Sequence, residues 1–131
     1  MKVQRVQHVS IPVPPGSADT ARAFFTGDLG MPDKKVPKEL DASLLTWFCA
    51  GEDEHEIHCF TDPDYESRSN AQHLCLQVED VDQARKDFVA KGVAVEETIE
   101  IHNRPRFFVR DPFGNYIEIA QIDGLYEEGN A

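Results

Sequence analysis

Apolar and polar residues alternate along the segments that we expect to form strands. The clearest such segment is 116–120 (YIEIA), which follows a turn-forming sequence at 111–115 (DPFGN). Asp-Pro favours the start of a tight turn, Gly-Asn tolerates a positive φ, and β-branched and aromatic residues suit a pleated strand. The two isoleucines then point to one face of the strand and Glu118 to the other. Because burying a carboxylate alone is costly, Glu118 needs water, a cation or a metal beside it.

The same reasoning predicts two runs of strands and helices. In the first run we expect a strand over 3–13, a helix over 18–26 with Ser17 as its N-cap, one short strand within the loop 31–42, a buried strand over 43–50 and a strand over 55–60. In the second run we expect a strand over 72–78, a helix over 81–91 capped by Asp80 with Gln83, a short strand over 93–95, and strands over 106–110 and 116–120. The residues after 122 are acidic, and we expect them to fray.

The two runs form an internal repeat. Gln7-His8 corresponds to Gln72-His73, and Ile57-His58 corresponds to Ile117-Glu118. Each run reads β-α-β-β-β, and one helix covers only one face of its sheet, so the other face needs a partner. We therefore expect an α+β fold in which two βαβββ modules, 1–65 and 66–131, form curved mixed sheets around a central cleft within one structural domain, joined by a polar linker at about 61–70.

Composition agrees with a single globular domain in a reducing compartment. The chain has 131 residues, of which 40% are hydrophobic and 28% are charged. Its longest mainly apolar run, 44–50, is too short to cross a membrane, and no apolar leader follows Met1. The three cysteines form no CxxC pair and make an odd number, so we expect a cytoplasmic protein without a disulfide framework.

The charge of the chain bears on its partners. The net charge is -11, with 24 acidic and 13 basic residues, and such a surface repels nucleic acid. Three arginines nevertheless cluster within a short stretch, at Arg104, Arg106 and Arg110. We expect Arg106 to bind the anionic group of a small molecule, because guanidinium suits bidentate recognition of carboxylates. The alternative is that these arginines pair with surface carboxylates.

Four side chains that can bind a metal occupy matching places in the repeat. His8 and His58 stand in the first and last strands of the first half, and His73 and Glu118 stand in the second. All four lie on the polar face of their strands, opposite the aliphatic face that packs on the helix. If a pseudo-twofold axis relates the halves, they converge in one cleft. Imidazole and carboxylate groups suit Zn, Ni, Co, Mn or Fe(II).

Other interpretations of these residues stay open. A single strand histidine is more often a surface or hydrogen-bonded residue than a ligand, although matched placement in two repeats favours the ligand role. Glu56 shares a face with His58 and could replace it as a ligand. Cys75 shares a face with His73, and could line a pocket or pack as a small residue. His55 and His102 fall in turns or loops, where we expect surface residues.

These motifs resemble the vicinal oxygen chelate superfamily, which includes glyoxalase I, methylmalonyl-CoA epimerase, fosfomycin-resistance enzymes, extradiol dioxygenases and bleomycin-resistance proteins. The resemblance covers about residues 3–122 and is carried by the two modules, the two Gln-His starts, 27–31 (GDLGM) and 111–118 (DPFGNYIE). It implies metal ligands at His8, His73 and Glu118. The fourth position is usually Glu or Gln in glyoxalase I and the epimerase. Here it is His58, a fourth ligand or a base beside the metal, and this departure argues against glyoxalase I proper.

The resemblance also implies a function. A divalent-metal-dependent, glyoxalase I-like lyase or isomerase would act on a small oxygenated, anionic substrate through an enediolate or oxyanion. Glu118 and His58 would be catalytic, and Arg106, Tyr116 and Cys75 would contact the substrate. One alternative is an Fe(II) extradiol-type dioxygenase, with Tyr116 and His102 as further acid/base candidates. Another is a metal-free drug-binding protein of the bleomycin-resistance type, whose cationic ligand the acidic charge would suit. The family also leads us to expect a homodimer.

Overall fold

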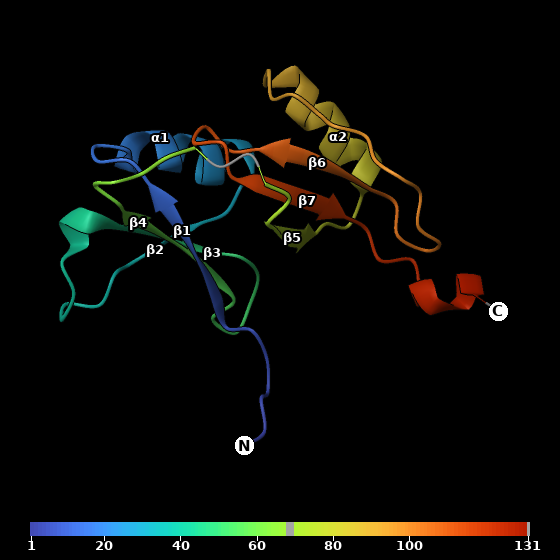
Figure 1. Ribbon diagram of the computed structural model, residues 1–131, viewed down its shortest axis with the longest axis horizontal. Coiled ribbons are helices and arrows are strands. Elements are labelled where there is room, and N and C mark those ends of the chain that lie inside the picture. The colour runs from blue at the N-terminus through green and yellow to red at the C-terminus, as the bar shows by residue number, and fades with distance from the viewer. Residues whose placement is uncertain (68–69, 131) are drawn as a thin grey trace. The chain divides into compact units, whose positions relative to one another are not determined.

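The computed structural model describes residues 1–67 and 70–130 and divides the chain into two compact modules. The first module is Met1–Ser67 and the second is Arg68–Ala131. In Figure 1 the first module runs from blue to green and the second from yellow-green to red. The expected linker at 61–70 falls at this division, and its residues Arg68 and Ser69 lie outside the described residues.

The first module contains one mixed sheet with the strand order β1-β4-β3-β2. β1 runs parallel to β4, whereas the other two pairs are antiparallel. The elements are β1 (His8–Val13), α1 (Ala18–Arg22), the π-helical turn η1 (Ala23–Asp28), β2 (Asp33–Lys34), the 3-10 turn η2 (Ala42–Leu44), β3 (Leu45–Cys49) and β4 (Glu56–Thr61).

The aliphatic face of this sheet forms the core of the first module, as its alternation predicts. Ile11, Ile57 and Cys59 are buried from the sheet side. From the helical side the core receives Phe25, whose ring stacks on Phe48 of β3 with 5.0 Å between the centroids. The opposite face is thereby left to carry the polar residues.

The second module repeats this arrangement with the strand order β5-β7-β6. β5 runs parallel to β7, and β6 runs antiparallel to β7. Glu96 bridges Phe108 at the outer edge of β6, where β2 would lie in the first module. The elements are β5 (His73–Gln77), α2 (Val81–Ala90), β6 (Arg106–Arg110), β7 (Tyr116–Ala120) and the 3-10 turn η3 (Tyr126–Asn130).

Strand register confirms the repeat at the level of single residues. In the first module Ser10 lies opposite His58, and in the second Cys75 lies opposite Glu118. His58 and Glu118 therefore occupy equivalent positions. The expected fold, an α+β protein with two mixed sheets of βαβββ type, is confirmed. The central cleft between the modules stays a prediction.

The β6–β7 turn is held by the side chain that the sequence pattern predicts. The buried Asp111 carboxylate accepts hydrogen bonds from the backbone N–H groups of Phe113 (2.9 Å) and Asn115 (2.8 Å). Gly114 has a φ of 88°, which glycine adopts without strain. This turn fixes the register that places Glu118 on the polar face.

The predicted helices differ from the observed ones at their ends. Ser17 makes no side-chain cap bond within the described residues, and α1 gives way to the wider turn η1. A wider turn reduces the angle between successive side chains, so the neighbouring Phe24 and Phe25 can both be buried. Asp80 does cap α2, accepting a 3.0 Å hydrogen bond from the Gln83 backbone, but the Gln83 side chain bonds to Asp87 instead of returning to Asp80.

Three segments differ from their predicted secondary structure: one strand is shorter, one is missing, and the tail forms a 3-10 turn. The first strand begins at His8 instead of residue 3, because its partner β4 begins at Glu56, opposite His8. Residues 93–95 form no strand, and pairing is limited to the bridge at Glu96. The acidic tail forms η3 instead of fraying. Within the described residues, no helix has the length and apolar character needed to span a membrane.

Candidate functional site

Five side chains gather on the polar face of the first sheet, and we call them the first-module cluster. β4 lies between β1 and β3, and its central residue His58 pairs with Ser10 on one side and Trp47 on the other. Lys34 of β2 pairs in turn with Trp47. The cluster consists of His8, Lys34, Trp47, Glu56 and His58.

Three aromatic rings of this cluster stack in the order of their strands. The His58 ring lies 3.6 Å from the Trp47 ring, with an angle of 1° between the planes. It also stacks on the His8 ring at 4.1 Å and 18°. His58 is buried, with 8% of its surface exposed, while His8 is exposed. The stack therefore holds the plane of the His58 imidazole.

A buried carboxylate bonds to the His58 ring. Glu56 is 5% exposed, and its Oε1 lies 2.8 Å from His58 Nε2. Lys34 Nζ lies 3.4 Å from the other oxygen, Oε2. That contact is an ion pair without hydrogen-bond geometry, because Oε2 has no hydrogen-bond partner among the described residues.

These contacts set the charges of the pair. Burial acts to raise the pKa of Glu56, but the bond to His58 and the charge of Lys34 outweigh it, so the pKa is lowered. For His58, burial is the largest effect and lowers the pKa, more than the bond to Glu56 raises it. At neutral pH Glu56 is therefore a carboxylate and His58 a neutral imidazole.

The proton on the His8 ring is placed by its neighbour. His8 Nδ1 lies 2.6 Å from Gln7 Oε1, and the Gln7 amide donates through Nε2 to the backbone oxygen of Glu54 at 2.7 Å. The second bond fixes which end of the amide faces His8, so His8 Nδ1 meets an acceptor and must donate. In the neutral ring, Nε2 then carries the lone pair.

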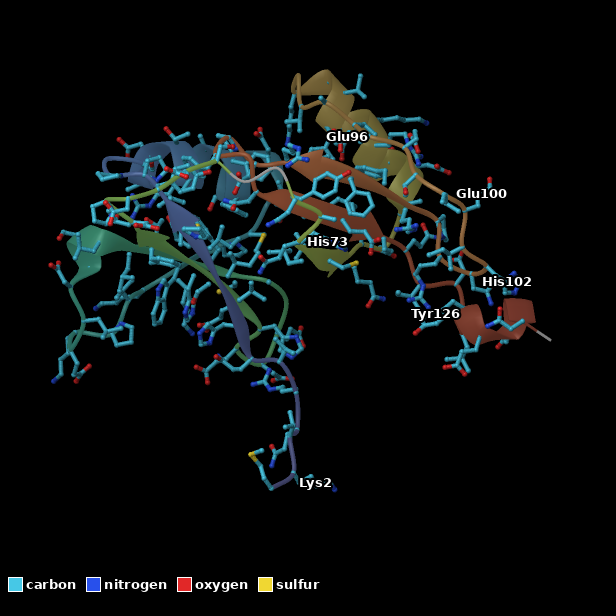
Figure 2. All side chains as sticks on the ribbon, viewed as in Figure 1. Lys2, His73, Glu96, Glu100, His102 and Tyr126 are labelled. Atoms are coloured by element: carbon cyan, nitrogen blue, oxygen red, sulfur yellow. The ribbon has the colours of Figure 1, made fainter. Side chains whose placement is uncertain are left out.

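The second module has a matching group, which we call the second-module cluster: His73, Cys75, Arg106, Tyr116 and Glu118. His73 is exposed on β5, and Figure 2 shows its side chain beside the sheet. Its Nδ1 lies 2.8 Å from the backbone oxygen of Ala71, again an acceptor, so Nε2 again carries the lone pair. The ring meets Phe108 edge-on, with 5.0 Å between centroids.

Glu118 lies between a guanidinium and a thiol. Arg106 Nη1 is 2.5 Å from Glu118 Oε1, and both side chains are 14% exposed. Burial raises the pKa of Glu118, but the hydrogen bonds from Cys75 and Arg106 outweigh it and the pKa is lowered. Burial of the thiol, together with the bond and charge of Glu118, raises the pKa of Cys75 to about 12, although the residue as a whole is exposed. At neutral pH Glu118 is a carboxylate and Cys75 a thiol.

The side chains of Arg106 and Tyr116 already make contacts with other residues of the same module. Arg106 donates through Nη2 to the backbone oxygen of Ile99 at 3.0 Å, in addition to its pair with Glu118. The Tyr116 ring stacks on Phe108 with 4.4 Å between the centroids, and the Arg110 guanidinium lies over the Tyr116 ring, 4.3 Å from its centroid. The hydrogen bond to Glu96 is the largest effect that raises the pKa of Tyr116, so its hydroxyl is a donor and no base at neutral pH.

The structure thus brings the predicted ligands together in pairs. His8 and His58 are in ring contact in the first module, and the charge of His73 acts on Glu118 in the second. Among the described residues, no group of three or more His, Cys, Asp or Glu side chains forms a metal site. The four-ligand set and the substrate roles of Arg106, Tyr116 and Cys75 stay predictions. His55 and His102 are exposed.

The chemistry of the donor set fits a divalent metal. His8 and His73 each direct Nδ1 to an oxygen acceptor and keep the lone pair on Nε2, as metal-binding histidines commonly do. His58 adds a neutral imidazole and Glu118 an ionised carboxylate. Such nitrogen and oxygen donors suit the borderline divalent ions.

Sequence patterns did not identify every member of the clusters. The sequence analysis did not identify Trp47 and Lys34 as site residues, because it is the register of β2 and β3 with β4 that brings them to His58. The role of Gln7 in orienting His8 could have been suspected from its place in the repeated Gln-His pair.

Comparisons with known proteins bear on the whole chain. Residues 5–119 match the family described as Glyoxalase/Bleomycin resistance protein/Dioxygenase superfamily. A glyoxalase family protein from Bacillus anthracis is 30% identical, with 93% of this chain and 98% of that chain covered and a TM-score of 0.85. No curated protein sequence matches the chain.

Two more distant structures show the fold alone. Lactoylglutathione lyase from Agrobacterium tumefaciens is 21% identical, over 92% of this chain and 96% of that chain, with a TM-score of 0.70. TnmS3, an antibiotic binding protein from Streptomyces sp. CB03234, is 20% identical, over 93% of this chain and 98% of that chain, with a TM-score of 0.73.

Proposed function

Because the chain belongs to the glyoxalase/bleomycin resistance protein/dioxygenase superfamily, we propose that it is a divalent-metal-dependent enzyme that acts on a small oxygenated substrate. One observation carries the proposal. In both modules the first-strand histidine has its Nδ1 proton bound to an oxygen acceptor and its Nε2 lone pair left as a potential metal donor. A surface histidine has no need of such an arrangement in two equivalent places.

The proposed ligands are His8 and His58 from the first module and His73 and Glu118 from the second. Zn, Ni, Co, Mn and Fe(II) all accept such a set. When bound, the ion would stabilise the negative charge that develops on two neighbouring substrate oxygens. A glyoxalase I-like lyase or isomerase reaction on an anionic substrate is the proposed chemistry.

The protein's own groups would supply the proton transfers. Glu118 is ionised and could act as the base, and the neutral His58 could do so only while its lone pair is not bound to the metal. Cys75 and Tyr116 remain protonated, and they could donate to substrate oxygens by exchanging their present hydrogen bonds to Glu118 and Glu96. Arg106 already pairs with Glu118, so it would have to bind an anionic group of the substrate in addition to this carboxylate.

The deciding experiment is metal analysis of protein purified anaerobically without a histidine tag. We expect about one ion per site in the wild type and its loss in His73→Ala, because a site with one ligand fewer binds far more weakly. His55→Ala is the matched control, since His55 is exposed and lies outside both clusters. Retention of metal by His73→Ala would contradict the proposed ligand set.

The same experiment separates two alternative functions. Iron in the anaerobic protein would favour an extradiol-type dioxygenase, and assays with catechols would follow. Absence of metal, with no uptake on titration, would favour a metal-free small-molecule binder. The net charge of -11 would then suit a cationic ligand.

A further inference from the structure

We propose that Glu56 is a positioning residue, which holds the His58 imidazole with its proton on Nε2 so that Nδ1 presents the lone pair. This inference rests on the proposed metal-dependent function. It assigns Glu56 a role beside the site instead of the ligand role that its place on the polar face allows.

The contact between the two side chains determines which nitrogen carries the proton. Glu56 Oε1 lies 2.8 Å from His58 Nε2. A carboxylate is an acceptor only, so the neutral ring must place its single proton on Nε2 to make this bond. The lone pair is then on Nδ1, the opposite choice from that of His8 and His73, whose Nδ1 atoms face acceptors.

Two further contacts keep this arrangement in place. Lys34 lies 3.4 Å from the second Glu56 oxygen and keeps a positive charge beside the buried carboxylate. The Trp47 ring lies parallel to the His58 ring, with 3.6 Å between the centroids. The His8 ring also stacks on the His58 ring, with 4.1 Å between the centroids. Rotation of the ring out of its plane would break both stacks, so Glu56 sets the tautomer and the stack sets the plane.

The register of the sheet also separates the roles of the two residues. His58 lies opposite Ser10, as Glu118 lies opposite Cys75, whereas Glu56 lies opposite His8. His58 therefore stands at the position equivalent to the proposed ligand Glu118. Glu56, with one oxygen on His58 and the other beside Lys34, acts as the carboxylate that orients a ligand histidine and increases its basicity.

The test is the histidine tautomer in the metal-free protein, measured by long-range ¹H–¹⁵N NMR after removal of metal by chelation. We expect His58 as the Nε2–H tautomer, and His8 and His73 as Nδ1–H tautomers. In Glu56→Gln the replacing amide can donate as well as accept, so the His58 signals should shift toward a mixture of tautomers. Glu52→Gln is the control, because Glu52 is exposed and lies outside both clusters, and its backbone oxygen, which accepts the His55 N–H, is unchanged by the substitution.

A second measurement connects the tautomer to the site. In a Zn²⁺ titration, we expect Glu56→Gln to bind about 10–100-fold more weakly than the wild type, the usual cost of losing a partner that orients a ligand. Glu56→Asp, which keeps the charge but shortens the side chain, replaces Glu56→Gln if the latter does not fold.

Three results would overturn the inference. They are a wild-type His58 that is not in the Nε2–H form, a tautomer that does not change in Glu56→Gln, and unchanged Zn²⁺ affinity in that variant. Failure of the wild type to bind Zn²⁺ or any other divalent ion would instead reject the proposed function. The NMR result does not depend on that outcome, because it is obtained without metal.

Discussion

At the level of single residues, Arg106 and Cys75 keep Glu118 charged in a site that burial would otherwise make unfavourable. Because the folded-state pKa of Glu118 lies below its unfolded value, its stabilising contribution is present above the unfolded pKa. That contribution is lost as the pH falls through the folded-state pKa. The Arg106–Glu118 pair is therefore a source of stability at neutral pH that acid removes.

We predict that Arg106→Met lowers the free energy of unfolding at pH 7 by about 3–5 kcal/mol, because it leaves Glu118 without its cation at a site only 14% exposed. The difference from the wild type should shrink as the pH falls through the lowered folded-state pKa of Glu118, below which this carboxylate is protonated in both proteins. Urea unfolding at a series of pH values measures both effects.

Arg85→Met is the matched control for this prediction. Arg85 pairs with Asp82 and Glu97 on the surface of the second module, with 31% of its side chain exposed. Surface pairs contribute little, so we expect a loss of about 1 kcal/mol or less. Equal losses in the two variants, or a loss in Arg106→Met that does not depend on pH, would contradict the argument.

At the level of elements, the end of α2 depends on a glycine. Gly92 has a φ of 77°, in the left-handed region, and a Cβ there would meet no atom of the described residues within 4 Å. We predict that Gly92→Ala lowers the free energy of unfolding by about 1 kcal/mol through backbone strain alone. Thermal or urea unfolding checks the value.

Gly27 provides the comparison for Gly92. It lies in η1 without a positive φ, and the atom of the described residues that a Cβ there would meet is the Arg22 backbone oxygen, at an ordinary contact distance of 4.0 Å. We expect Gly27→Ala to be neutral or to stabilise by about 0.5–1 kcal/mol, since alanine loses less conformational entropy. If both substitutions had the same sign and size, backbone conformation would not be the cause.

The strands differ in how well their sequences predict them, and the difference has a physical reason. β6 and β7 match the predicted bounds, because alternation and the chemistry of the 111–115 turn both act locally. Residues 93–95 have suitable side chains for a strand, yet pairing with β6 involves only Glu96. Strand length depends on the partner, and neither the register nor the length of a partner strand can be read from local sequence.

The candidate site likewise combines features that local sequence predicts with features that depend on neighbouring strands. The repeat predicted the equivalent placement of His58 and Glu118, and the register confirms it. It could not predict that Trp47 and Lys34 join His58, nor which ring nitrogen of each histidine is protonated. Those properties depend on cross-strand neighbours and on single acceptor atoms such as Gln7 Oε1.

At the level of the whole molecule, the proposed metal site needs two ligands from each module. Each module by itself presents a pair of candidate ligands, and within the described part of the chain neither presents three. Substituting both ligands of one module should therefore abolish metal binding as fully as substituting those of the other. We predict this loss for the variant His8→Ala/His58→Ala and for the variant His73→Ala/Glu118→Ala.

Mixing these two variants extends the prediction to the expected homodimer. If one site takes its four ligands from a single chain, every chain in the mixture lacks one pair and no metal binds. If a site takes its pairs from two chains, each mixed dimer regains one intact site. Because half of the dimers formed by random exchange are mixed, and each mixed dimer has one intact site of two, metal binding should then recover to about one quarter of the wild-type level.

Metal analysis after unfolding and refolding the mixture makes the measurement, with each variant refolded alone as the control. Full binding by either variant alone would contradict the four-ligand proposal itself.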